Sequence, residues 1–215
     1  MARVESMWYS EVPMGAKRDI KTADRILDAA EKLVQVRGFN AFSYADVSKA
    51  VGIQKASLHH HFATKTDLGV ALVERYRRVF LEALAGIESE EDAAVDRLER
   101  YIGLYRTVLR KKRMCMCGML AADVATLPTP MRDSVAVFFA ENESWLTRVI
   151  SAGTSRGELH FAGTPASMAA FIVSSLEGAM LVARGRGEPD HLDDVAALLI
   201  ANMRPPKPSR SAKAR

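Results

Sequence analysis

One short stretch of the chain carries five polar side chains that can each hydrogen-bond to a partner outside the protein. These side chains are Gln54, Lys55, Ser57, His59 and His60. Together they form a surface that is polar but only weakly charged. Such a surface suits the base edges and phosphates of double-stranded DNA better than it suits a protein core. The stretch therefore predicts a DNA contact.

These residues lie in the second of two short helices that the sequence predicts over residues 43–62. Ser43 can cap the first helix, and Asp46 three residues later completes a capping box. Gly52 stands between the helices, where a sharp turn often needs a positive φ. Two short helices joined in this way are typical of a helix-turn-helix DNA reader. Ser43 and Tyr44, at its beginning, are added to the expected DNA contacts.

Three consecutive histidines, His59, His60 and His61, raise the alternative of a metal site. Consecutive side chains of a helix point about 100° apart, so three adjacent imidazoles cannot bind one ion in ordinary geometry. We therefore expect no metal ion and no cofactor. His59 and His60 are expected to face DNA, whereas His61, beside Phe62, is expected to turn inward as a hydrogen-bonded packing residue.

Cys115 and Cys117 form a second chemical candidate. Four cationic residues, 110–113, come shortly before them, and a helix N-terminus is expected nearby. Both features stabilise a thiolate and favour reaction with oxidants or electrophiles. Residues two apart on a helix point about 200° apart, so these thiols cannot form a disulfide with each other without unwinding. The alternative is that both cysteines are small buried packing residues, and the sequence leaves sensing and packing open.

The composition fits one elongated domain or two small ones. Of the 215 residues, 48% are hydrophobic, which is enough for a substantial core. We find no run of about 18 or more apolar residues and no signal peptide, so we expect a soluble, cytoplasmic protein without a membrane partner. Two cysteines do not make a disulfide framework. The net charge of +4 is uneven, because residues 1–80 and 205–215 are basic and the residues between them are acidic.

Apolar residues recur at helical spacing along almost the whole chain, which predicts an all-α protein of about nine helices. Besides the two short helices, the expected ranges are 22–37, 64–86, 92–110, 117–125, 130–156, 164–185 and 190–203. Residues 1–19 are expected to be a flexible arm and 205–215 a disordered basic tail. Between them we expect an N-terminal domain over 20–66 and a larger helical domain, the body, over 67–204.

The stretch that begins at Gly52 resembles the signature of the TetR family of bacterial helix-turn-helix transcriptional regulators. In that signature a Gly and a short recognition helix precede Leu-Tyr-x-His-Phe, a polar pair, Lys, two residues and Leu. Phe62, Lys65 and Leu68 stand at the matching positions. His59 departs from the pattern, because the family usually has a tyrosine there whose hydroxyl reaches a phosphate. An imidazole can still donate that hydrogen bond.

The resemblance is strong over about residues 20–75 and implies a division of labour. The N-terminal domain would be a three-helix DNA reader, and the body would bind a small-molecule effector and form a homodimer. Two copies would then read a palindromic operator with half-sites about 34–36 Å apart, or a multiple of that. Effector binding would tilt the long helix 64–86 and release the DNA, which makes the protein a repressor. Lys65 is expected on a phosphate.

The effector site and the dimer contact are both expected in the body. Met and aromatic side chains line apolar pockets well, although at helical spacing they are also ordinary core. The pocket candidates are Tyr101, Tyr105, Met119, Phe138, Trp145 and Phe171. The effector would be a small organic or reactive electrophilic molecule. Small residues within helix 164–185 allow close helix approach and helix 190–203 adds apolar area, so we expect these two helices at the dimer interface.

Two other functions stay open. The chain would in one case be a helical interaction protein without specific DNA binding. In the other it would be an enzyme that uses Cys115 or a histidine. Against an enzyme, the sequence has no catalytic Ser/His/Asp or Cys/His order, no phosphate-binding glycine loop and no metal-ligand spacing. The sequence therefore favours a regulator.

Overall fold

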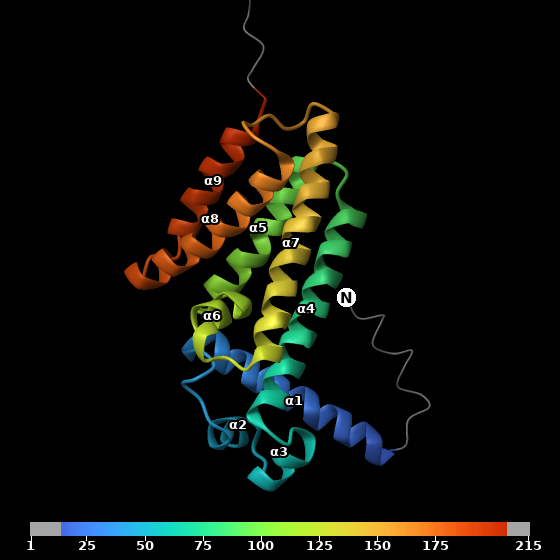
Figure 1. The fold of residues 1–215 in the computed structure, drawn as a ribbon, viewed down its shortest axis with the longest axis vertical. Coiled ribbons are helices and arrows are strands. Elements are labelled where there is room, and N and C mark those ends of the chain that lie inside the picture. Colours follow the sequence, from blue (N-terminus) through green and yellow to red (C-terminus); the bar gives the residue numbers. More distant parts are fainter. Residues whose placement is uncertain (1–13, 206–215) are drawn as a thin grey trace, which may run out of the picture.

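The computed structural model describes the backbone of residues 14–205 and the side chains of residues 21–205. Within these residues it has nine α-helices, one 3-10 turn at Val124–Thr126 and no strand, which confirms the all-α class (Figure 1). The helices are α1 (Met14–Arg37), α2 (Tyr44–Val51), α3 (Lys55–His61), α4 (Lys65–Glu90), α5 (Ala94–Arg110), α6 (Met116–Ala122), α7 (Thr129–Ser155), α8 (Pro165–Arg186) and α9 (His191–Met203).

Two helices are longer than the sequence predicts. α1 begins at Met14 rather than near residue 22, so part of the expected flexible arm is helical. α4 continues past Gly86 to Glu90, because Gly86 keeps a helical backbone and the buried Ile87 extends the apolar face. The rest of the expected arm and nearly all of the expected tail, residues 1–13 and 206–215, lie outside the described residues.

Local sequence signals determine where α2 and α4 begin and where α2 ends. Ser43 and Asp46 form the predicted capping box at α2, and Thr64 and Asp67 form another at α4. Each box satisfies backbone N–H groups that have no partner at a helix N-terminus. Gly52 ends α2 with φ 76° and ψ 38°, the left-handed conformation that such a turn needs. The turn itself therefore sets the angle between α2 and α3.

One long helix, α4, belongs to both parts of the molecule. In Figure 1, α1, α2 and α3 lie together at one end, and α4 runs from them into the body. α4 packs along α7, which packs on α8, and α8 packs on α9. Leu68 and Leu72 near the start of α4 are fully buried, as is Leu84 towards its other end. The core therefore continues from the reader into the body without a break.

The C-terminal end of α1 is also held by the body. The carbonyl of Gln35 accepts a hydrogen bond from the backbone N–H of Met114 at 3.1 Å. The carbonyl of Val36 accepts one from the guanidinium of Arg184, on α8, at 2.6 Å. The last carbonyls of an α-helix have no partner within the helix. Here residues of the body are those partners.

The loop that follows α1 is attached in the same way. The backbone N–H of Phe39 donates to the carboxylate of Asp123 at 3.1 Å. The side-chain amide of Asn40 donates to the hydroxyl of Thr126 at 2.7 Å. Both partners follow α6, so the junction between reader and body consists of several hydrogen bonds in addition to α4.

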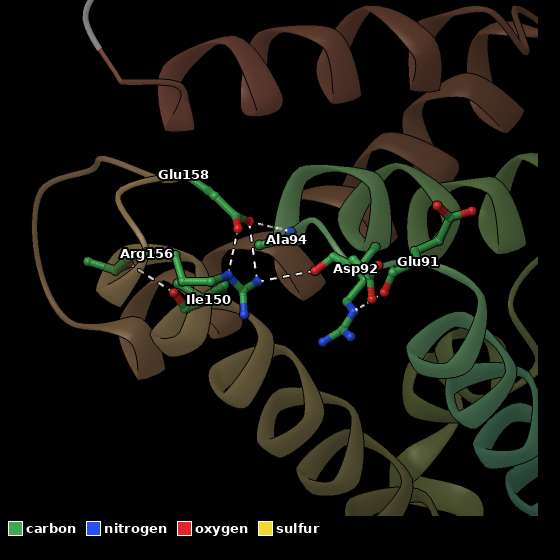
Figure 2. A network of polar contacts seen from close by, with 8 residues as sticks. Glu91, Asp92, Ala94, Ile150, Arg156 and Glu158 are labelled. Carbon is green, nitrogen blue, oxygen red and sulfur yellow. Dashed lines mark hydrogen bonds and ion pairs between the residues drawn. The ribbon is translucent and has the colours of Figure 1, made fainter.

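A polar network attaches the loop after α7 to the start of α5, at the far end of the body (Figure 2). Glu158 accepts a hydrogen bond from the backbone N–H of Ala94 at 2.6 Å and so satisfies a group at the N-terminus of α5. Arg156 donates to both oxygens of Glu158 and to the carbonyl of Asp92. The hydrogen bonds from Arg156 and Ala94 lower the pKa of Glu158, which keeps it charged.

Within the described residues, α8 alone is long and apolar enough to cross a membrane by length and composition. Core helices of globular proteins often meet the same criterion. α8 packs between α7 and α9, and 39% of its most apolar segment is buried inside the protein. We therefore describe it as a core helix of the body.

Candidate functional site

α3 presents the polar surface that the sequence predicts. Leu58 is fully buried and anchors the helix to the core. Ser57 is half-buried, on the edge of the surface. The exposed side chains are Gln54, Lys55, His59 and His60. A short helix with a buried anchor and an exposed polar face is suited to contact with another macromolecule.

The sequence places Ser43 and Tyr44 among the DNA contacts, and in the structure the side chains of both make hydrogen bonds within the protein. The hydroxyl and the backbone N–H of Ser43 both donate to Asp46 at 2.7 Å. The hydroxyl of Tyr44 donates to the carbonyl of Phe62 at 2.9 Å and joins the start of α2 to the end of α3. Burial, with a smaller effect of Asp67, raises the pKa of Tyr44 to about 12, so the hydroxyl keeps its proton. Ser43 therefore caps α2, and Tyr44 holds α2 against the end of α3.

His59 is exposed, yet one of its two ring nitrogens is already in use. Nδ1 lies 3.1 Å from the carbonyl of Ala63. A carbonyl only accepts, so Nδ1 carries the proton of this bond. The ring also packs against Tyr44, with 4.8 Å between ring centroids. In the neutral imidazole Nε2 is then an acceptor, and it becomes a donor only when the ring is protonated.

The ammonium of Lys65, expected on a phosphate, binds the protein instead. Nζ donates to the carbonyls of Phe39 and Phe42 at 2.7 and 2.6 Å. It also lies over both rings, 4.6 and 4.4 Å from their centroids. Burial lowers the pKa of Lys65, and the carboxylates of Asp46 and Asp123 act in the opposite direction. Lys65 therefore ties the start of α4 to the loop between α1 and α2.

A cavity of about 250 Å³ lies where α1 meets the body. α4 contributes Tyr76 and Phe80 to its wall, and α5 contributes Tyr105. Gln35 of α1 and the thiol of Cys115 also line it. Most of the lining is apolar, with a few polar atoms, which is the usual character of a small-molecule site.

Of the six residues predicted for the effector pocket, one lines this cavity and three lie beside it. Tyr105 lines the cavity. Tyr101, Phe138 and Trp145 are buried beside it in an aromatic cluster. Tyr101 stacks on Trp145 with centroids 5.6 Å apart, and Phe138 packs against Phe80 of the cavity wall at 5.2 Å. These three residues support the wall rather than form it.

Met119 and Phe171, the other two candidates, lie away from the cavity. Met119 is on α6, with its sulfur 3.3 Å from a guanidinium nitrogen of Arg184. The side chain of Phe171 is 58% exposed on α8. Apolar residue type alone did not distinguish a cavity wall from a helix junction or from an outer surface.

Glu31 and Gln35 are cavity residues that the sequence analysis missed, because it assigned α1 to the DNA reader alone. The side chain of Gln35 is 2% exposed. A signal for this was present: Gln35 directly follows Val34, on the apolar face that α1 buries. A polar residue at the edge of such a face is a candidate for an interior site.

The surroundings of Cys115 and Cys117 favour packing over activation of the thiols. Both thiols are buried. Burial raises both pKa values, and the nearby Glu177 carboxylate raises them further. The four preceding cations are exposed or half-buried and do not offset this effect. Burial and the raised pKa values therefore support the packing alternative. Cys115 also lines the cavity and accepts a hydrogen bond from Tyr76 at 3.8 Å.

Glu177, on α8, is a further interior polar group. One carboxylate oxygen lies so close to α6 that a Cβ added to Gly118 would be 2.2 Å from it. The other oxygen, Oε1, is buried and has no hydrogen-bond partner among the described residues. Burial raises the pKa of Glu177 to about 7, and a hydrogen bond with Cys115 opposes this shift. The interior next to Cys115 is thus acidic in character.

α8 and α9 leave an apolar stripe on the outer surface of the body. Phe171, Leu181 and Val182 of α8 are 58%, 54% and 44% exposed, and Leu198 of α9 is 65% exposed. The smaller Ser174 falls on the same side of α8 by helical spacing. Large apolar side chains exposed on two neighbouring helices are typical of an interaction surface.

Two segments of the chain match models of protein families. Residues 26–72 match the model described as bacterial regulatory proteins, tetR family. Residues 94–199 match the model described as tetracyclin repressor-like, C-terminal domain. The first match covers the reader and the start of α4, and the second covers most of the body.

Individual proteins agree with these matches. A TetR-family transcriptional regulator from Agrobacterium tumefaciens, of solved structure, is 32% identical, with 87% of this chain and 100% of that chain covered and a TM-score of 0.84. The transcriptional repressor NemR of Escherichia coli is 26% identical over 170 residues, 76% of this chain and 84% of that protein. The transcriptional regulator AcuR of Cereibacter sphaeroides is 25% identical over 187 residues, 84% of each.

The proteins that share these features regulate transcription as DNA-binding proteins and are not enzymes. The helix-turn-helix falls within the first matched segment and most of the helical body within the second, and α4 connects the two. The chain is a member of the TetR family of bacterial transcriptional regulators.

Proposed function

We propose that the protein is a repressor that binds a palindromic operator as a homodimer and releases it when a small molecule occupies the cavity. The observation that carries the proposal is the exposed polar face of α3, with Gln54, Lys55 and His60 around the buried anchor Leu58. A helix of this kind fits the major groove, where side chains reach base edges. The site of action is the bacterial cytoplasm, where the DNA lies.

The apolar stripe on α8 and α9 supports the homodimer. One recognition helix contacts few base pairs, so specific binding requires two, related by the two-fold axis of a palindrome. A two-fold interface uses the same surface on both subunits. Phe171, Leu181 and Leu198 supply apolar area for such a self-complementary contact, and Ser174 lets the helices approach closely.

The position of the cavity supports control by an effector. Its walls come from α4 and α5, and α1 closes one side. A molecule that binds there changes the packing of the reader against the body. Only a difference in affinity between the DNA-binding and released arrangements can shift the equilibrium between them. We expect the effector to prefer an arrangement in which the two recognition helices no longer match the half-site spacing.

The first test is binding to the DNA region upstream of the protein's own gene. At physiological salt we expect at least about a thousandfold preference for this region over random DNA, with two chains per site. Fluorescence anisotropy gives the affinities and sedimentation gives the stoichiometry. Equal affinity for the two DNAs would instead support a helical interaction protein.

Two lysine variants separate DNA contact from structural support. The salt slope is the change in the logarithm of operator affinity with the logarithm of salt concentration. Lys55→Met is expected to reduce this slope by about one unit per subunit, because one phosphate contact is lost. Lys65→Met is expected to leave the slope unchanged. It should lower the free energy of unfolding by about 1–3 kcal/mol, since two carbonyls lose their partner. Anisotropy across salt concentrations and urea denaturation measure the two effects, and a reduced slope for Lys65→Met contradicts the assignment.

His59→Tyr tests the place of His59 at DNA. Ala63 holds the Nδ1 proton, so Nε2 is the ring nitrogen left for a partner outside the protein. A tyrosine hydroxyl is a donor that can reach a phosphate, so we expect His59→Tyr to keep or increase the affinity for the operator. His59→Phe has no such donor and is expected to reduce the affinity. Fluorescence anisotropy at constant salt measures both variants, and equal affinities refute the role.

An electrophilic effector is the second candidate, because Cys115 lines the cavity. Its raised pKa argues against fast reaction. We therefore expect iodoacetamide at pH 7 to leave both thiols of the folded protein unmodified within minutes, with unchanged operator affinity. Mass spectrometry measures the adducts. Rapid modification of Cys115 with loss of DNA binding, absent in Cys115→Ser, would make the electrophile the better candidate.

A further inference from the structure

We propose that the cavity is selective for a small neutral molecule with an apolar body and one hydrogen-bond donor, and that Gln35 of α1 accepts that hydrogen bond. The inference rests on the proposed function, because the molecule would be the effector. It goes further in naming the chemical class of the ligand and the residue of the DNA reader that recognises it.

The size of the cavity limits the ligand. Its volume is about 250 Å³. For comparison, an apolar cavity of roughly 150 Å³ accommodates benzene. Tyr76, Phe80 and Tyr105 present aromatic surface to it, and Leu104 and Met180 present aliphatic surface. The space therefore fits about one ring with a short substituent, or an aliphatic molecule of similar size.

The charges around the cavity exclude an anion. Among the described residues that line it, Glu31 is the charged one, and no lysine or arginine is present. Glu31 is paired with Arg75 at 2.9 Å, which directs that guanidinium to Glu31 rather than to the cavity. Glu177 adds a second carboxyl group behind Cys115. A carboxylate or phosphate placed here would lose its water and gain no cation, which is strongly unfavourable.

Gln35 supplies the unsatisfied polar group. Its side chain is 2% exposed, and Oε1 is buried without a hydrogen-bond partner among the described residues. A buried acceptor that is left unpaired destabilises the structure, and a ligand with an N–H or O–H group removes this penalty. The carbonyl of Gln35 is bound by Met114 at 3.1 Å, so the backbone at this position is held against the body. Gln35 thus brings an unpaired acceptor to the lining of the cavity.

This position gives the ligand a direct contact with the DNA reader. Gln35 lies in the last turn of α1, whereas Tyr76 and Tyr105 belong to α4 and α5. A ligand between them bridges the reader and the body. Binding of the ligand then acts directly on α1 and not only through a tilt of α4.

Three probes of similar size test the ligand class: benzyl alcohol, which is neutral with a donor; toluene, which is neutral without one; and benzoate, which is an anion. Dissociation constants come from NMR titration of the full-length protein. We expect benzyl alcohol to bind about tenfold tighter than toluene, a ratio that corresponds to one hydrogen bond. Benzoate is expected to bind more weakly than both.

Gln35→Leu tests the residue, because leucine keeps similar volume and removes the acceptor. We expect toluene to bind at least as well as in the wild type and the preference for benzyl alcohol to disappear. Thr107→Val is the matched control, since it removes a hydroxyl at the exposed edge of the same cavity and should keep the preference. Circular dichroism melts of both variants establish that they are folded.

The outcomes separate this inference from the proposed function. Tighter binding of benzoate, binding of none of the three probes, or an unchanged preference in Gln35→Leu each overturns the inference. If the preference follows the expected pattern but saturating benzyl alcohol leaves operator affinity unchanged, the ligand class stands and release by the ligand fails. If the protein shows no specific operator binding, repression fails while the titrations remain valid.

Discussion

The last turn of α1 cannot satisfy its own carbonyl groups, and the relation between reader and body depends on how they are satisfied. The carbonyls of Gln35 and Val36 accept hydrogen bonds from donors in the body. The ammonium of Lys65 donates hydrogen bonds to two carbonyls of the loop that follows α1. The donors come from α4, α8 and the segment before α6. The reader is therefore held at the last turn of α1 and at the loop after α1. It cannot move relative to the body without exchanging hydrogen bonds at the end of α1.

This arrangement bears on the control that we propose for the cavity. The same turn of α1 that is bound by the body also forms part of the cavity wall, through Gln35 and Glu31. Packed junctions with buried hydrogen bonds change between discrete arrangements rather than deform continuously. A molecule that alters the separation of α1 and α4 therefore acts on the element that sets the orientation of α3. Coupling of this kind is reciprocal, so operator DNA would also weaken ligand binding.

Much of the fold was predictable because its signals are local. The capping box of Ser43 and Asp46, the left-handed Gly52 and the apolar periodicity depend on neighbours within a few residues. The roles of the candidate site residues were harder to predict from the sequence. Lys65 and Tyr44 were expected at DNA, but their partners are set by the packing of α2 and α4, which no local pattern reveals. Likewise, the cations before Cys115 are close in sequence, whereas burial and the distant Glu177 determine its pKa.

The position of Gln35 has a consequence for how the protein can evolve. Regulators diversify by changing their ligand while keeping their operator, or the reverse, and this is easiest when separate parts of the chain carry the two properties. Here the side chain at the cavity wall belongs to the same turn of α1 whose carbonyls hold the reader in place. A substitution there that admits a new ligand also alters the reader's support. If the proposed function holds, ligand choice and operator choice would be under joint selection at this position, whereas residues of α5 such as Tyr105 could change with less effect on DNA binding.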